Sequence, residues 1–233
     1  MESKRARLDR FISVKTSINR KHVRLLLAKG LVEVDGKVAR DIDQIIDEFS
    51  HVCLEGEILQ ANTPSYVMLH KPIGVVSATV DDKHKTVIDL LTHKDKHSLH
   101  IVGRLDLNTS GLLLLTNDGR WSKRLMSPEH KVAKLYRVTL KNPLDVSYIN
   151  AFAAGMYFEF EDITTLPAKL EIIDEYTALV SLMEGRYHQI KRMFGRFRNP
   201  VVGLHRISVG NIVLDSDLVP GQSRLLTAGE VSE

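Results

Sequence analysis

The chain has 233 residues, of which 43% are hydrophobic and 26% charged, values that are ordinary for a globular protein and indicate neither disorder nor a fibrous repeat. Its one cysteine, Cys53, excludes a disulfide framework and a cysteine-based zinc or iron–sulfur centre, because these need several thiolates. No apolar run approaches the roughly 18 residues that span a bilayer, and the N-terminus lacks the apolar stretch of a secretory signal. We therefore expect a cytoplasmic protein without a membrane partner.

Basic residues are unevenly distributed, although the formal net charge is only +3. Residues 1–30 hold nine Lys or Arg against two acidic residues, whereas residues 31–62 hold two against eight. A positive block followed by a negative one indicates a small module that presents one face to polyanions. A solvated helical surface explains the charges equally well. The block contains Lys4, Arg5, Arg7, Arg10, Lys15, Arg20, Lys21, Arg24 and Lys29.

The first 62 residues have the pattern of two helices followed by a small sheet. Apolar residues at i, i+3 and i+4 predict short amphipathic helices around residues 8–12 and 23–27. Gly30 ends the second helix, and Asp35-Gly36 predicts a hairpin between residues 31–34 and 37–38. Alternation continues at residues 52–54 and 58–59. The polar residues 60–65 have the composition of a linker, so we expect two domains, residues 1–62 and 63–233.

The larger domain mixes strand-like and helical patterns without strict βαβ alternation. This order favours an α+β fold with a largely antiparallel sheet over a doubly wound one. The predicted strands are residues 66–69, 112–116, 136–140, 179–183 and 212–214, and the predicted helices lie near 86–91, 120–126, 145–154 and 187–197.

The most unusual segment spans residues 103–119, where a polar loop containing Arg104 and Asp106 leads into the apolar run 112–116. A loop on a rigid strand can hold a carboxylate out to a ligand. Arg104 could reach a phosphate or fill the space left by a displaced base. The alternative is a polar hairpin in which Arg104 and Asp106 form a surface ion pair.

Two further segments combine basic and aromatic residues. On a helix, His188, Lys191 and Arg192 would share a face, which could contact phosphates or place a cation beside a carboxylate from elsewhere. A helix with a solvated basic side is the alternative. In residues 134–138, Tyr136 lies between cations at the start of a strand, where a tyrosine can equally belong to the core.

A metal site or a nucleotide cofactor has little support in the sequence. His93, His97 and His100 have the spacing i, i+4, i+7, but the residues between them are polar and offer no apolar face to bury a metal. Neither a P-loop nor a GxGxxG motif is present. We expect no metal and no cofactor.

These motifs resemble one family closely. The block GRLDLNTSGLLLLTNDG, with LHKPIGVVSA upstream and KLYRV and EGRYHQIKRMF downstream, resembles the RsuA-type pseudouridine synthases, which modify ribosomal RNA. RLDRFISV and NRKHVRLLLAKGLVEVDGKV near the N-terminus resemble the S4 RNA-binding domain that these enzymes carry. The resemblance covers residues 7–227, and DDKHKTV at 81–87 is similar to the member that acts on the small subunit.

The resemblance implies isomerisation of a uridine in 16S ribosomal RNA, the uridine 516 activity of the family, without a cofactor. By resemblance, the nucleophilic aspartate falls on Asp106, the intercalating arginine on Arg104, the active-site tyrosine on Tyr136 and the basic partner of the aspartate on Lys191. Contacts to RNA fall on a larger basic set, namely Arg7, Arg20, Lys21, Arg24, Lys29, Arg186 and Arg192.

The residue types suit this chemistry. Isomerisation needs an ionised carboxylate near the ribose or the uracil, acting as nucleophile or base, and a nearby cation that keeps it charged, as Asp106 and Lys191 would supply. The target base must also leave its stack, at a cost of about a few kcal/mol that an aromatic face and a gap-filling side chain offset. Whether the aspartate attacks the sugar, attacks the base or abstracts a ribose proton stays open.

Two other functions compete with this reading. A non-catalytic RNA-binding or ribosome-assembly protein would also use an S4-like module and a basic helix, but it gives the Asp106 loop no task. A hydrolase that uses Asp106 and Glu184 on a glycosidic bond leaves the S4-like domain without a purpose. The expected partner is ribosomal RNA or a partly assembled small subunit, and the expected oligomeric state is a monomer.

Overall fold

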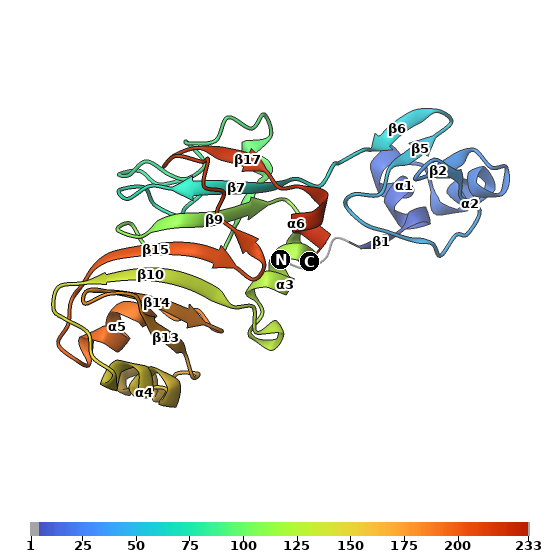
Figure 1. The fold of residues 1–233 in the computed structure, drawn as a ribbon. Helices are drawn as coiled ribbons and strands as arrows, with labels where there is room; N and C mark the ends of the chain where they lie inside the picture. Colours follow the sequence, from blue (N-terminus) through green and yellow to red (C-terminus); the bar gives the residue numbers. More distant parts are fainter. Residues whose placement is uncertain (1–4, 233) are drawn as a thin grey trace. The chain divides into compact units, whose positions relative to one another are not determined.

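A computed structural model describes residues 5–232, which divide into two compact units with the boundary between Pro64 and Ser65. Lys4 of the basic block lies outside the described residues. The expected mixture of helices with a mainly antiparallel sheet is confirmed (Figure 1). None of the described helices is long and apolar enough to cross a membrane.

The first unit packs two helices on a small sheet. Helices α1 (Leu8–Thr16) and α2 (Arg20–Ala28) bury the apolar residues that predicted them, and the Asn19 side chain caps α2 by accepting a hydrogen bond from the His22 amide. Asp35 and Gly36 form the hairpin turn with positive φ angles. The sheet has the order β3 (Lys37–Val38), β2 (Val32–Val34), β5 (Val52–Leu54), β6 (Glu57–Gln60), and β1 (Ala6–Arg7) pairs with β4 (Ile45–Ile46).

The second unit is built on a nine-stranded sheet. All its neighbouring strands are antiparallel except β15 and β9, which pair in parallel at its centre (Figure 1). The strand order is β13 (Lys169–Ile172), β14 (Thr177–Leu182), β10 (Lys134–Leu140), β15 (Val201–Val209), β9 (Ser110–Thr116), β7 (Tyr66–Lys71), β17 (Ser223–Leu225), with β16 (Ile212–Val213) on β15 and β8 (His100–Val102) on β9.

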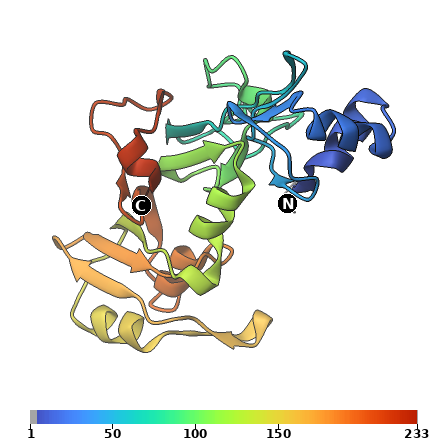
Figure 2. The ribbon, with the colours of Figure 1, turned by 90° about the vertical axis from the view of Figure 1, so that its right-hand side faces the viewer.

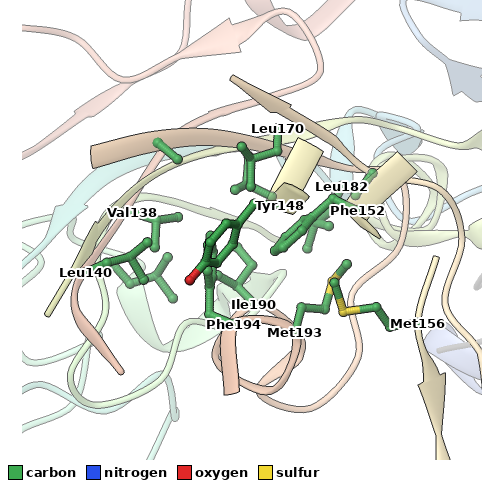
Figure 3. Close-up of a cluster of buried hydrophobic side chains, with 14 of the residues drawn as sticks. Val138, Leu140, Tyr148, Phe152, Met156, Leu170, Leu182, Ile190, Met193 and Phe194 are labelled. Carbon is green, nitrogen blue, oxygen red and sulfur yellow. The ribbon is translucent and has the colours of Figure 1, made fainter. Parts of the chain in front are cut away.

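Short helices cover the sheet and are held there by two buried clusters, while a third cluster packs the segments between β7 and β9 on the sheet. Helix α4 packs beside β13 (Figure 2), and the largest cluster joins α4 and α5 to strands β10, β13 and β14 (Figure 3). The elements are α3 (Gly119–Met126), α4 (Ser147–Ala154), α5 (Gln189–Gly195), α6 (Ala228–Ser232), η1 (Lys96–Ser98), η2 (Pro128–His130) and η3 (Glu159–Glu161), with the small hairpin β11 (Tyr157–Phe158) and β12 (Ile163–Thr164).

The helix predicted near residues 86–91 is wrong. The segment forms successive turns, because the Asp89 carboxylate accepts hydrogen bonds from the backbone amide and hydroxyl of Thr86 and closes a local turn. Val87, Ile88 and Leu91 are nevertheless buried, as part of the cluster against β7 and β9. The apolar spacing therefore marked a buried segment whose backbone is not helical.

The central strand β15 was not predicted from the sequence. Its middle residues, His205 and Arg206, are polar, and Gly203 further weakens its strand pattern. In the structure Arg206 is buried at 2% exposure and donates to backbone carbonyls of neighbouring segments. Charged residues are almost never fully buried unless paired, so a simple hydropathy pattern misses such a strand.

Candidate active site

A pocket of about 680 Å³ opens within the second unit. Most of its lining comes from regions that lie far apart in the sequence: the loop before β9, the strands β10 and β15, and the segment that leads into α5. Ser77 and Met126 complete it from the segment after β7 and the end of α3. The pocket therefore forms only when the sheet brings these distant segments together. Asp106, Tyr136 and Lys191, which the resemblance singled out, all line it.

Asp106 lies in the loop between β8 and β9 and faces two side chains of the α5 region. Its Oδ2 is 3.3 Å from Lys191 Nζ and 3.3 Å from His188 Nε2. The Asp106 side chain keeps 36% of its exposure, so a ligand in the pocket can still reach it. The arrangement can thus present an accessible carboxylate, held between Lys191 and His188, to a ligand.

Lys71, which is fully buried at the end of β7, holds the backbone around Asp106 in place. Its Nζ donates to the carbonyl oxygens of Pro72 at 3.0 Å, Asp106 at 3.0 Å and Thr109 at 2.8 Å. Burial lowers the pKa of Lys71 to about 8, and the Asp106 charge acts in the opposite direction. The ammonium group therefore fixes the shape of the loop that carries Asp106.

Ser77 and Arg206 fix the remaining parts of the loop. The Ser77 hydroxyl donates to the Leu105 carbonyl at 2.7 Å and accepts from the Leu105 amide at 3.0 Å. Arg206 donates from Nε to the Leu112 carbonyl and from Nη2 to the Gly103 carbonyl, both at 2.8 Å, and so joins the two ends of the loop. Buried polar groups with several partners make a rigid support for a site.

Close packing of β9 on β15 completes this support at Gly111. The glycine has a φ of +109°, and a Cβ atom there would lie 2.3 Å from the Arg206 carbonyl oxygen. Only glycine combines this conformation with such a close approach of two backbones. The parallel pairing of the two central strands therefore depends on it.

Helix α5 supplies the groups that face Asp106. Ile190, Met193 and Phe194 point into the large buried cluster (Figure 3), which leaves Lys191 on the pocket side. His188 precedes the helix with a left-handed φ of +49°, and its ring stacks on Tyr187 at 3.9 Å between centroids. The core thus orients both groups.

Tyr136 and Arg104 occupy different places on the pocket. Tyr136 is half-buried on β10 and packs against two of the buried clusters, so its ring sits on a rigid part of the wall. Arg104 is exposed and lines the pocket two residues before Asp106. The sequence allowed a surface ion pair between Arg104 and Asp106. In the structure the Asp106 carboxylate pairs with Lys191 and His188 instead.

His188 and Lys191 lie on the same side and face one carboxylate, but the expectation that they share a helical face with Arg192 is wrong. His188 lies before the helix, and Arg192 turns away to Glu161, with its guanidinium 3.7 Å from the centre of the Phe158 ring. Arg186 forms an ion pair with Glu184 at 2.9 Å. The carboxyl group of Glu184 also accepts hydrogen bonds from Gln189 and the Leu166 amide, so both of its oxygens are engaged within the protein.

In the first unit, three arginines converge on one buried carboxylate. Asp9 is fully buried, and its Oδ2 lies 2.8 Å from Arg20 Nη2, 3.1 Å from Arg7 Nη2 and 3.8 Å from Arg24 Nη2. The arginine side chains keep 40% to 49% of their exposure, so one carboxylate holds three guanidinium groups at the surface. Lys21 and Lys29 are exposed on the same helix and its end. This cluster is the positive face of the unit.

Among residues 5–232 the structure shows no group of three or more His, Cys, Asp or Glu side chains that could hold a metal ion. His93, the first of the three histidines considered above, forms a hydrogen bond through Nε2 with the Ser65 hydroxyl at 3.1 Å.

Lys71, Ser77 and Arg206 were missed as site residues by sequence reasoning. Lys71 and Ser77 lie in the block LHKPIGVVSA but were given no role there, and Arg206 lies in none of the blocks, because a charged residue in a strand is normally taken as exposed. The available signal for Lys71 was its position two residues after the apolar run 66–69 and directly before Pro72, where β7 ends.

Comparison with known proteins places this site in a family. Residues 65–195 match the family model described as RNA pseudouridylate synthase. A relative from Pseudomonas aeruginosa named "Ribosomal small subunit pseudouridine synthase A" is 50% identical, and the alignment covers 97% of this chain and 98% of the relative. Relatives of the same name from Vibrio cholerae and Escherichia coli are 43% and 40% identical over the same shares.

A solved structure supports the same assignment. A crystal structure described as that of a pseudouridylate synthase aligns with a TM-score of 0.71 at 39% identity, covering 97% of this chain and 98% of the other. The fold and pocket therefore define an RNA-modifying enzyme, and the chain belongs to the RNA pseudouridylate synthase family.

Proposed function

We propose that this enzyme isomerises a uridine of small-subunit ribosomal RNA to pseudouridine, at the position numbered 516 in the 16S RNA, with Asp106 as nucleophile or base. The relatives that match almost the whole chain are named for the small subunit, which supports this substrate. The observation that carries the proposal is the exposed Asp106 carboxylate held 3.3 Å from Lys191 Nζ in a 680 Å³ pocket.

The chemistry asks for no redox step and no phosphate donor. The bond between ribose C1′ and uracil N1 breaks, the base turns within the site, and a bond forms between C1′ and C5. The C5 proton is lost and N1 gains one. Asp106 acts near the sugar or the base, and Lys191 stabilises its charged form. The supported loop keeps the carboxylate in place while the base moves.

The neighbouring residues suit the extraction of the base. We assign the half-buried Tyr136 ring as the surface on which the flipped uracil stacks, because it lies on the rigid wall of the pocket. Arg104 at the rim would occupy the gap that the base leaves in the RNA. Arg186 and Arg192 would contact phosphates only through the parts of their guanidinium groups not engaged by Glu184 and Glu161.

The first unit is proposed to act as an S4-like RNA-binding domain. The exposed guanidinium groups of Arg7, Arg20 and Arg24, together with Lys21 and Lys29, form a positive face suited to phosphates. We expect the protein to act as a monomer on ribosomal RNA or on a partly assembled small subunit.

The test is tritium release from ribosomal RNA labelled at uridine C5, because the C5 hydrogen leaves only if C5 forms the new bond. We expect release of one tritium per small-subunit RNA at a single position, and none from large-subunit RNA of the same labelling. Mapping of the product should place pseudouridine at position 516. Binding of small-subunit RNA without release would instead favour the non-catalytic RNA-binding alternative.

A further inference from the structure

The pocket contains a buried lysine that the reaction as described does not use. Lys134, the first residue of β10, lines the pocket and is 8% exposed. The structure gives its Nζ no hydrogen bond or ion pair among the described residues. In the same part of the chain, the only fully enclosed side-chain polar atoms without a partner are Glu48 Oε2 and Thr109 Oγ1. The Lys134 ammonium therefore keeps an opening towards the pocket.

Arg206 is the charged neighbour of this lysine, and it too lines the pocket. Its Nε and Nη2 are committed to the Leu112 and Gly103 carbonyls, while Nη1 is the guanidinium nitrogen without a recorded acceptor in residues 5–232. Burial lowers the pKa of Lys134, and the positive charge of Arg206 lowers it further. Two neighbouring buried cations repel each other and lose hydration, which raises the free energy of the empty pocket. Binding of an electron-rich group lowers that free energy.

The burial of Lys134 and Arg206, which are 8% and 2% exposed, decides which part of an RNA can reach them. The phosphate backbone is continuous, so phosphates stay at the mouth, where the exposed Arg104 and Arg186 lie. Only a flipped base projects inward from the backbone. The electron-rich atoms of uracil are its two carbonyl oxygens. A carbonyl oxygen of the base is therefore the group that meets a buried ammonium.

We propose that Lys134 is a further catalytic residue, which binds a carbonyl oxygen of the flipped uracil and stabilises the negative charge that the base acquires during isomerisation. The inference rests on the proposed function. When the C1′–N1 bond breaks, its electron pair stays with uracil, and the charge spreads from N1 onto the carbonyl oxygens. If Asp106 adds to C6 instead, the same electrons move to a carbonyl oxygen. Both orders of steps thus place negative charge on a carbonyl oxygen of the base, the atom that Lys134 is proposed to bind.

The charge is transient, and the atoms balance without a further reactant. The electron pair returns from the base when C5 bonds to C1′, the C5 proton leaves, and N1 takes up a proton. A preformed cation aimed at developing charge stabilises the transition state more than the ground state, because the neutral base in the bound substrate interacts with it less strongly. Arg206 acts as a positioning residue that holds the corner together.

The test compares Lys134→Met with Lys141→Met, a matched control at an exposed lysine just after the same strand. We expect the single-turnover rate of tritium release at saturating RNA to fall by about a hundredfold in Lys134→Met, as for removal of an oxyanion donor. The dissociation constant for RNA should stay within about threefold, and the Lys141→Met control should match the wild type in both.

Two outcomes overturn the proposal while leaving the proposed function intact. A Lys134→Met rate equal to that of the wild type would show that the ammonium is not used. Weaker RNA binding and a flatter salt dependence, with an unchanged rate at saturation, would make Lys134 a phosphate contact. Lys134→Gln, a polar side chain without charge, decides the same question if the methionine variant is unstable. Absence of tritium release by the wild type would instead refute the proposed function itself.

Discussion

At the scale of single residues, the pocket contains two kinds of group: side chains that are proposed to take part in the reaction, and buried side chains that fix the backbone around them. Asp106 and Lys191 were assigned from the sequence by resemblance, with which a carboxylate in a polar loop and a basic residue beside aromatic ones agree. Lys71 and Arg206 escaped notice because their donors satisfy backbone carbonyls, a task that any buried donor can perform. Such partners become visible only when distant segments are brought together.

Lys191→Met should lower turnover much more than RNA affinity. The change removes the ammonium 3.3 Å from Asp106 Oδ2 and leaves a side chain of similar length in the pocket wall. We expect the single-turnover rate to fall by about a hundredfold and the dissociation constant to change by less than about threefold. Lys169→Met on the exposed side of β13 serves as the control. A loss confined to RNA binding would identify Lys191 as a phosphate contact instead.

At the scale of elements, sequence periodicity located the helices of the first unit and most strands of the sheet. It did not find the short strands β8, β13 and β17, and at two other places it failed for clear physical reasons. Residues 86–91 bury apolar side chains in turns that Thr86 and Asp89 close. Strand β15 has a buried arginine, Arg206, near its centre, which breaks its hydropathy pattern. The parallel contact of β15 with β9 depends on strands about ninety residues apart, and local patterns carry no information about such pairing.

Gly111→Ala should disrupt this central pairing. Its Cβ would lie 2.3 Å from the Arg206 carbonyl oxygen at a φ that disfavours alanine. We expect the free energy of unfolding to fall by about 3 kcal/mol or more, with loss of activity, in chemical denaturation and tritium-release assays. Gly185→Ala is the matched control, since a Cβ there meets nothing within 4 Å and the φ is not positive. Equal stability of the two variants would contradict the structure at this contact.

Asp9→Asn should weaken RNA binding although it makes the protein more positive. Burial raises the pKa of Asp9, but hydrogen bonds from Arg20 and Arg7 outweigh it, and the pKa is lowered overall. The ionised carboxylate therefore stabilises the folded unit above its unfolded-state pKa, and this contribution is lost only as the pH falls through the folded-state pKa. At neutral pH the amide would weaken the hold on Arg20 and Arg24, while Arg7 keeps its ion pair with Asp43 at 2.6 Å.

The control for Asp9→Asn is Glu33→Gln, which changes the net charge equally at an exposed carboxylate of β2. Filter binding at low salt should show affinity several-fold weaker for Asp9→Asn, and unchanged or slightly stronger for Glu33→Gln. Thermal unfolding checks that the first unit of each variant stays folded at the assay temperature. If both variants bind more tightly than the wild type, net charge alone governs affinity and the arginine cluster has no organised role.

At the scale of the whole molecule, the charge pattern and the linker composition predicted two parts, and the structure divides at Pro64 and Ser65. The fold class follows from the mixed order of strands and helices. The strand order does not, because a sheet of nine strands admits many arrangements with the same local patterns. The pocket depends on that order, so the sequence could name its residues by resemblance without placing them around a common cavity.

A truncated protein that begins at Thr63 should fold and bind ribosomal RNA more weakly. The second unit has three buried clusters of its own, and removal of the first unit takes away the arginine cluster. The slope of log affinity against log salt should flatten by about 0.7 to 0.9 for each lost phosphate contact. At low salt and high RNA concentration the truncated protein should still release tritium. An unchanged salt slope would show that the first unit does not touch the RNA.

The central claim is that Asp106 performs the isomerisation. Its most direct test measures tritium release and RNA affinity for Asp106→Asn beside the wild type on small-subunit ribosomal RNA. The amide keeps the shape of the side chain but can serve neither as nucleophile nor as base. We predict turnover below about a hundredth of the wild-type value, with affinity within a few-fold. Activity above that level, at unchanged affinity, would contradict the assignment of Asp106 as the reacting group.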